Sequence, residues 1–284
     1  MLVGCLLFIA LAVTGCSSSK GHLDLNWNTF WGDILSPDGA IINGLWLTIS
    51  ISVIAQFLGV LLGTFAALGK SAKFLPFRLL ANVYIWFFRG TPLLVQLVLF
   101  RFGLQAANLF FWPTIELGPI QILPEILAGT LIMGVNEGAY MAEIVRAGIM
   151  SIDPGQQEAA KSLGMTYGQT MGRIVLPQAA RVIIPPLGNE FNNMLKTTSL
   201  LQIIGVFELF NTFSIKYSND FQTFVHMLAA CVWYLLLTTI WGVVQAWIER
   251  KLSKGTNLNS DAGGPSWTAR FLGRGRPETS LGGH

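Results

Sequence analysis

The chain has 284 residues, of which 52% are hydrophobic and only 12% are charged, and its mean hydropathy is +0.55. A soluble domain of this length could not bury so much apolar surface, so we predict an integral membrane protein. The net charge of +3 is too small to indicate a nucleic-acid partner, and we expect none. The three cysteines and three histidines are scattered, which argues against a metal site and against a disulfide framework.

The N-terminal segment, residues 1–16, begins with an apolar run and ends in Val13-Thr14-Gly15-Cys16. This ending resembles the bacterial lipobox, in which the cysteine is lipidated and becomes the new N-terminus; an uncleaved signal anchor is the alternative. Both interpretations place residues 17–37 outside the cytoplasm, as an extracytoplasmic linker. At the other end, residues 253–284 are rich in Gly, Ser, Pro and Arg, which predicts a disordered cytoplasmic tail.

Between these ends, residues 38–252 form the predicted transmembrane domain. We expect an all-α fold with about five transmembrane helices, because five apolar stretches approach or exceed the roughly 20 residues that span a bilayer. They are residues 40–69, 87–111, 125–150, 177–199 and 224–248. If the N-terminus is outside, most of the 18 lysines and arginines fall in segments that lie inside, in agreement with the positive-inside rule. The C-terminus is therefore predicted to be cytoplasmic.

A polar segment, residues 153–177, separates the third and fourth predicted spans. Asp153, followed by Pro154 and Gln156, is typical of a capped helix start, and Gly164 is a natural left-handed stop. Thr166 and Gln169 form a second capping box, which predicts a second short helix before Pro177 opens the next span. The apolar face of this second helix comprises Tyr167, Met171, Ile174 and Val175. Such an elbow on the cytoplasmic side could dock a protein partner, or it could be an amphipathic hairpin that caps the bundle.

The spacing within this elbow resembles the EAA signature of the permease subunits of bacterial ABC importers. The matching residues are Glu158, Ala159, Ala160, Gly164, Ile174, Leu176 and Pro177. Three further stretches are similar to the polar amino acid branch of that family, which includes histidine, glutamine, glutamate and arginine permeases. They are RGTP at 89–92 followed by LLVQL, NEGAYMAEIVRAGI at 136–149, and PPLGNEFNNMLKTTSL at 185–200. The resemblance covers roughly residues 38–252.

The resemblance implies a type I ABC importer permease fold, in which the elbow docks on a cytoplasmic ATPase dimer. It further implies the membrane-spanning permease subunit of an ATP-driven importer for polar amino acids, in the bacterial cytoplasmic (inner) membrane. Such a chain is not an enzyme and binds no cofactor, since ATP and Mg²⁺ belong to the ATPase. The other implied partners are a second permease copy or paralogue, an extracytoplasmic amino-acid-binding protein and the lipid bilayer. A passive channel, or another solute carrier without an ATPase partner, is the alternative.

Polar side chains inside the predicted spans are candidates for the substrate path, because such groups usually face water or the bundle interior. Arg101 could pair with a substrate carboxylate, pair with an internal glutamate, or extend to the interface. In the fourth span, Pro185 and Pro186 should interrupt the helix next to a group of polar residues, although polar contacts between helices would explain them equally. The candidates are Arg101, Glu137, Asn189, Glu190, Asn192, Asn193 and Lys196.

Overall fold

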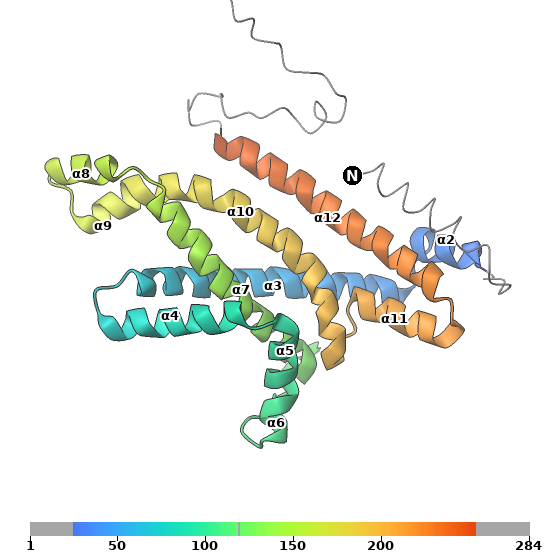
Figure 1. The fold of residues 1–284 in the computed structure, drawn as a ribbon. Coiled ribbons are helices and arrows are strands. Elements are labelled where there is room, and N and C mark those ends of the chain that lie inside the picture. The colour runs from blue at the N-terminus through green and yellow to red at the C-terminus, as the bar shows by residue number, and fades with distance from the viewer. Residues whose placement is uncertain (1–24, 119, 254–284) are drawn as a thin grey trace, which may run out of the picture.

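The computed structural model describes residues 25–118 and 120–253, and most of them are helical (Figure 1). The segment around Cys16 and the tail from 254 onward lie outside these residues, so the predictions for them stay predictions. By length and composition, α3 (Gly39–Lys70) and α12 (Thr223–Ser253) could each cross a membrane. The number rises to four if each of two bent helix pairs counts as one span. α7 (Pro124–Met150) does not meet this criterion, and about half of its residues are buried by the rest of the chain.

The centre of the fold is the contact between α3 and α7, the most extensive contact between any two elements. Glycines lie four residues apart on both helices, Gly59 and Gly63 on α3 and Gly134 and Gly138 on α7. A Cβ atom at Gly59 would lie 2.7 Å from Cγ of Glu137, and one at Gly63 would lie 2.8 Å from the backbone nitrogen of Ala142. Small residues at this spacing let two helices approach closely, as in membrane helix pairs.

The predicted span over 87–111 is not a single straight helix, because the chain bends inside it. α4 (Leu75–Gly90) ends before Thr91, and α5 (Leu93–Val98) starts after Pro92 and leads through the π-helical turn η1 (Leu99–Gly103) into α6 (Leu104–Ala106). The two helical stretches differ in direction by 105°. The cause is local: the helical region is disfavoured for a residue before proline, and Thr91 is extended with φ −118° and ψ 143°. A two-stranded hairpin, β1 (Ile115–Leu117) and β2 (Ile120–Ile122), then precedes α7.

The elbow lies at one end of the bundle (Figure 1). Its first helix is α8 (Pro154–Ser162). The second predicted helix is not a separate element: α9 (Tyr167–Thr170) continues through the π-helical turn η2 (Met171–Val175) into α10 (Leu176–Thr197). The predicted interruption at Pro185 and Pro186 is also wrong, because α10 remains helical through both. α12 packs along this stretch, and Trp241 Nε1 donates to the backbone oxygen of Gly188 at 2.8 Å. Prolines are tolerated in membrane helices where a neighbouring helix supports the backbone.

The opposite end of the bundle holds α2 (Trp27–Leu35), α11 (Leu209–Asp220) and the start of α12 (Figure 1). The sequence predicted only a linker over 17–37, and the structure places the nine-residue helix α2 within it. The 3₁₀ segment η3 (Thr198–Ile204) and Gly205, with φ +88°, connect α10 to α11. Glu208 caps the start of α11, and its buried carboxylate accepts from the backbone nitrogens of Phe210 at 2.9 Å and Asn211 at 2.7 Å.

Candidate functional site

A cavity of about 230 Å³ lies between the start of α5, the middle of α7 and the second half of α10. It is lined by Leu93, Met133, Asn136, Glu137, Tyr140, Glu190, Asn193, Met194 and Thr197. On both long helices the lining residues follow the spacing i, i+3 or i+4, i+7, so each helix presents one face to the cavity. The walls therefore consist of two helix faces that carry charged, amide and hydroxyl groups.

Glu137 is the most enclosed charged group in this cavity. Its residue is only 7% exposed, and its Oε1 atom is buried without a hydrogen-bond partner among the described residues. The glycines of the α3–α7 contact explain its position, because Gly59 leaves the room that the Cβ and Cγ atoms of Glu137 occupy. The close helix contact thus places a carboxylate at the edge of a cavity.

Two buried amides connect the cavity to the bend at Pro92. Gln96, which is 1% exposed, donates through Nε2 to the backbone oxygen of Phe88 at 3.0 Å and to Oγ1 of Thr91 at 2.7 Å. Asn136 donates through Nδ2 to the same Phe88 oxygen at 3.0 Å and to Oε1 of Gln96 at 3.0 Å. These bonds hold the end of α4 and the start of α5 against α7. The sequence analysis missed Gln96, although a single amide in the apolar run LLVQL was a usable signal.

Three of the seven predicted path residues, Glu137, Glu190 and Asn193, come together in the cavity. Arg101 does not line it. Its Nη1 donates to Oε1 of Gln105 at 2.8 Å, and its Nη2 lies 3.9 Å from Oε2 of Glu125.

The remaining three predicted residues lie on other faces of α10. The Asn189 side chain accepts a hydrogen bond from Gln245 of α12 at 3.2 Å, which is a contact between helices. The amide oxygen of Asn192 is buried without a partner among the described residues. Lys196 lines a different cavity of about 270 Å³, together with residues of α11 and α12.

The predicted capping of the elbow is confirmed. Oδ1 of Asp153 accepts from the backbone nitrogen of Gly155 at 2.9 Å. Thr166 and Gln169 form the full capping box, with each side chain bonded to the backbone nitrogen of the other residue. Gly164 adopts φ +76°, the left-handed conformation that ends α8.

The predicted apolar face of the second elbow helix is only partly buried. Glu158 and Ala159 are exposed, but Ala160 is 1% exposed and faces the chain itself. Tyr167 does not share the buried face of Val175, because it is 73% exposed, and Leu163 at the tip is 82% exposed. Of the remaining motif residues, Gly164, Leu176 and Pro177 are exposed and Ile174 is half-buried. The tip of the elbow therefore offers an apolar, unpacked surface next to the charge of Glu158.

Residues 59–254 match the family described as the binding-protein-dependent transport system inner membrane component. The chain belongs to this family. It is 37% identical over 262 residues to the arginine transport system permease protein ArgU of Corynebacterium glutamicum, which covers 89% of this chain and 80% of that protein. It is 34% identical over 212 residues to the probable glutamine ABC transporter permease protein GlnM of Bacillus subtilis (strain 168), which covers 75% of this chain and 93% of that protein.

A solved structure titled as an amino acid ABC transporter with histidines is also similar, with a TM-score of 0.69 and 34% identity. The likeness covers 81% of this chain and 100% of that chain. It confirms the predicted type I importer permease fold. As a binding-protein-dependent inner membrane component, the chain is a transport subunit and not an enzyme, and ATP hydrolysis resides on a separate subunit of such systems. This family membership rules out the alternative function considered above, a passive channel without an ATPase partner.

At the end of this transport subunit opposite the elbow, five titratable side chains form a network. Nδ1 of His226 lies 2.6 Å from Oδ2 of Asp33, and Nε2 lies 2.8 Å from Oδ2 of Asp220. Nζ of Lys216 lies 2.8 Å from Asp33 and 2.7 Å from Asp38. No group of three or more His, Cys, Asp or Glu in residues 25–118 and 120–253 is placed to hold a metal ion.

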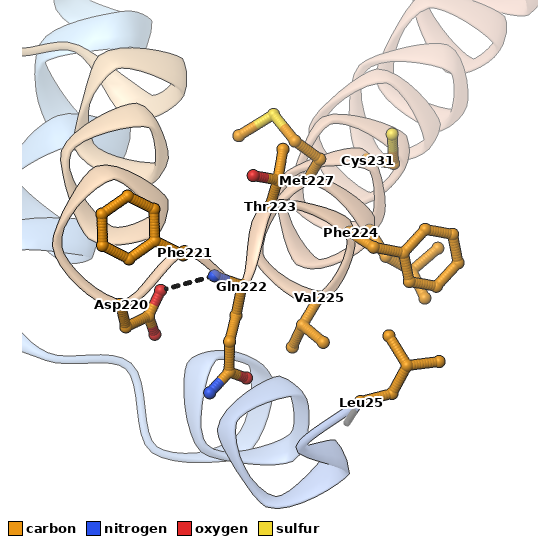
Figure 2. A pocket seen from close by; sticks show the side chains of 10 residues that line it. Leu25, Asp220, Phe221, Gln222, Thr223, Phe224, Val225, Met227 and Cys231 are labelled. Atoms are coloured by element: carbon orange, nitrogen blue, oxygen red, sulfur yellow. Dashed lines mark hydrogen bonds between the residues drawn. The ribbon is translucent and has the colours of Figure 1, made fainter. Parts of the chain in front are cut away.

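A cavity of about 950 Å³ lies beside this network at the turn from α11 to α12 (Figure 2). Its lining is mainly apolar, and Figure 2 shows Asp220 accepting a hydrogen bond from the backbone nitrogen of Gln222, at 2.9 Å. Leu25, the first described residue, is part of its wall.

Proposed function

We propose that this chain is the permease subunit of an ATP-driven importer of polar amino acids, and that the cavity between α7 and α10 lies on the path of the substrate. The family and the relatives named for arginine and glutamine transport support the class of substrate. The observation that carries the proposal is the cavity itself, with carboxylate and amide groups from two helices converging on about 230 Å³. Such groups are costly inside a membrane protein unless a solute or water uses them.

The same proposal assigns the two ends of the bundle. The elbow end and the C-terminus face the cytoplasm, and residues 153–176 dock on an ATPase dimer. A second permease subunit, identical or paralogous, completes the pathway, and an extracytoplasmic binding protein delivers the amino acid to the opposite end. The positive-inside distribution supports this orientation in the bacterial inner membrane. The exposed Glu158, Ala159 and Leu163 support docking at the tip of the elbow. Closure of the ATPase would then move the elbow and re-orient the helices that carry the cavity.

The test is uptake of labelled amino acids into proteoliposomes that contain the permease, its ATPase and its binding protein. Asn193→Leu removes an amide from the cavity wall at nearly constant volume, and we expect it to lower uptake while the ATPase stays associated. Glu158→Lys reverses the charge at the elbow, and we expect it to release the ATPase while the permease still inserts. Unchanged uptake in Asn193→Leu would remove the cavity from the path, and unchanged ATPase association in Glu158→Lys would remove the elbow from the docking surface.

A further inference from the structure

The short helix α2, at the end of the bundle opposite the elbow, has an apolar side that the described chain leaves open. Trp27, Trp31 and Leu35 are 48%, 54% and 73% exposed. At about 100° per residue, these three side chains fall within a sector of about 80°. The side of α2 that packs against the rest of the chain is a different one, and it carries the buried Phe30 and Asp33. The exposed stripe of Trp27, Trp31 and Leu35 is therefore not part of the core.

The remaining surface of α2 is polar or small. Asn28 and Gly32 are exposed beyond the stripe, and the half-buried Thr29 lies next to them. The only charged residue among the nine of this helix is Asp33, which faces inward. The helix thus has one side against the protein, one apolar side and one uncharged polar side. Separate apolar and polar sides suit a helix that lies at the boundary between hydrocarbon and water.

Contacts with other helices fix the direction in which the stripe points. The Asp33 carboxylate lies 2.8 Å from Nζ of Lys216 on α11 and 2.6 Å from Nδ1 of His226 on α12. Nε1 of Trp233 on α12 donates to the backbone oxygen of Asp33 at 3.1 Å. Phe30 packs in a buried cluster with side chains of α3, α11 and α12. Because these contacts hold one side of α2, the stripe is directed away from them.

The place of α2 in the chain puts it at a membrane boundary. Only residues 36–38 separate it from α3, and it packs beside α12 (Figure 1). Both α3 and α12 are long and apolar enough to cross a membrane, so α2 lies where two spans begin. Leu25, just before α2, and Phe224 of α12 line the same mainly apolar cavity (Figure 2). The apolar surface therefore continues from the start of α2 onto a membrane span.

We infer that the stripe of Trp27, Trp31 and Leu35 is seated in the lipid bilayer, at the boundary between headgroups and acyl chains. Lipid is the partner that fits, because tryptophan is enriched at this boundary, where its ring is apolar and its N–H reaches polar groups. The exposed sides of α2 carry no charge, so burial of apolar surface holds the stripe and anionic lipid is not required. Through Asp33, α2 then fastens α11 and α12 to the boundary. The inference does not depend on the proposed substrate path.

The experiment measures how often a nitroxide label collides with oxygen, which partitions into lipid, and with a water-soluble nickel chelate. The label is attached through a ketone-bearing amino acid, so that the native cysteines stay, at one position of the full-length permease complex in phosphatidylcholine nanodiscs. We expect the ratio of oxygen to nickel collisions to be severalfold higher at Trp31 and Leu35 than at Asn28. Phe57, exposed in the middle of α3, is the lipid reference, and Asn219, exposed on α11, is the water reference.

Three results would overturn the inference. Equal ratios at Trp31 and Asn28 would show that the stripe faces water. Loss of collisions with both reagents at Trp31 and Leu35, in the complex alone or after addition of the extracytoplasmic binding protein, would identify a protein-binding face instead. A lipid-like ratio that required phosphatidylglycerol would show that charge, and not apolar burial, seats the helix. The label at Leu35 decides the question if a label at Trp31 prevents folding.

Discussion

A single methyl group placed in the α3–α7 contact should measurably destabilise the subunit. In Gly63→Ala, the new Cβ would lie 2.8 Å from both the nitrogen of Ala142 and the oxygen of Gly138, where ordinary contact begins at 3.4 Å. The Cβ of Met141 lies closer still, and neither it nor the backbone can rotate away, so the two helices must separate by at least about 0.6 Å or distort. Overpacking of this kind costs about 1–3 kcal/mol.

The matched control is Gly242→Ala on α12, where an added Cβ meets nothing within 4 Å. Both variants make the same change inside a helix, so the gain from replacing glycine by alanine largely cancels between them. Thermal unfolding of the two purified proteins should then differ by the overpacking alone, about 2–12 °C if 1 kcal/mol corresponds to about 2–4 °C. Equal unfolding temperatures would show that the glycines do not set the helix separation.

Three more predictions concern the bend, the elbow and the network at the opposite end. Gln96→Leu leaves the donor of Asn136 with one acceptor fewer and removes the brace of the bend. It should cost about 1–3 kcal/mol in thermal unfolding and raise the KM for uptake. Gly164→Ala must hold φ +76° at a cost of about 1–2 kcal/mol and should weaken ATPase association, whereas Gly168→Ala, at an ordinary φ, should not. At the opposite end, burial alone would raise the pKa of Asp38. The ion pair with Lys216 and the hydrogen bond from the Ile41 N–H outweigh burial and hold this pKa below its ordinary value of 3.8. The stabilisation that ionised Asp38 gives the fold is therefore complete above pH 3.8 and is lost as the pH falls through the lowered pKa. Wild type should unfold at a higher temperature than Asp38→Asn at pH 6, with the difference vanishing in acid.

Features that depend on a few neighbouring residues could be predicted from the sequence. The apolar run of α3 and the capping box of Thr166 and Gln169 involve contacts within one or two turns, and both are present as expected. The left-handed conformation of Gly164 followed from its position after a polar helix. Local chemistry decides these features, so the rest of the fold does not alter them.

Features that depend on the direction of the chain in space could not be predicted from the sequence. The predicted span over 87–111 assumed a straight helix through Pro92, but the chain turns by 105° there. Apolar residues on both sides of the bend hid it. The pairing of His226 with Asp33 joins residues 193 positions apart, and neither residue has a local signal of the other. Glu137 and Glu190 meet for the same reason, through packing of α7 near α10.

The elbow connects the two walls of the cavity directly, and this constrains how it can move them. α7 ends at Met150 and α8 begins at Pro154, while α9 continues through η2 into α10. The two walls are packed together at this end: Gly148 leaves room for Ile183, and Ile152, Val175 and Ala179 form a small buried cluster. From Leu176, α10 runs about 21 Å to Glu190 at 1.5 Å per residue. A force on the elbow therefore cannot easily separate α7 from α10 where they join it. It would instead rotate them about this packed end, so that the largest change in their separation occurs farther along, towards Glu190 and Asn193.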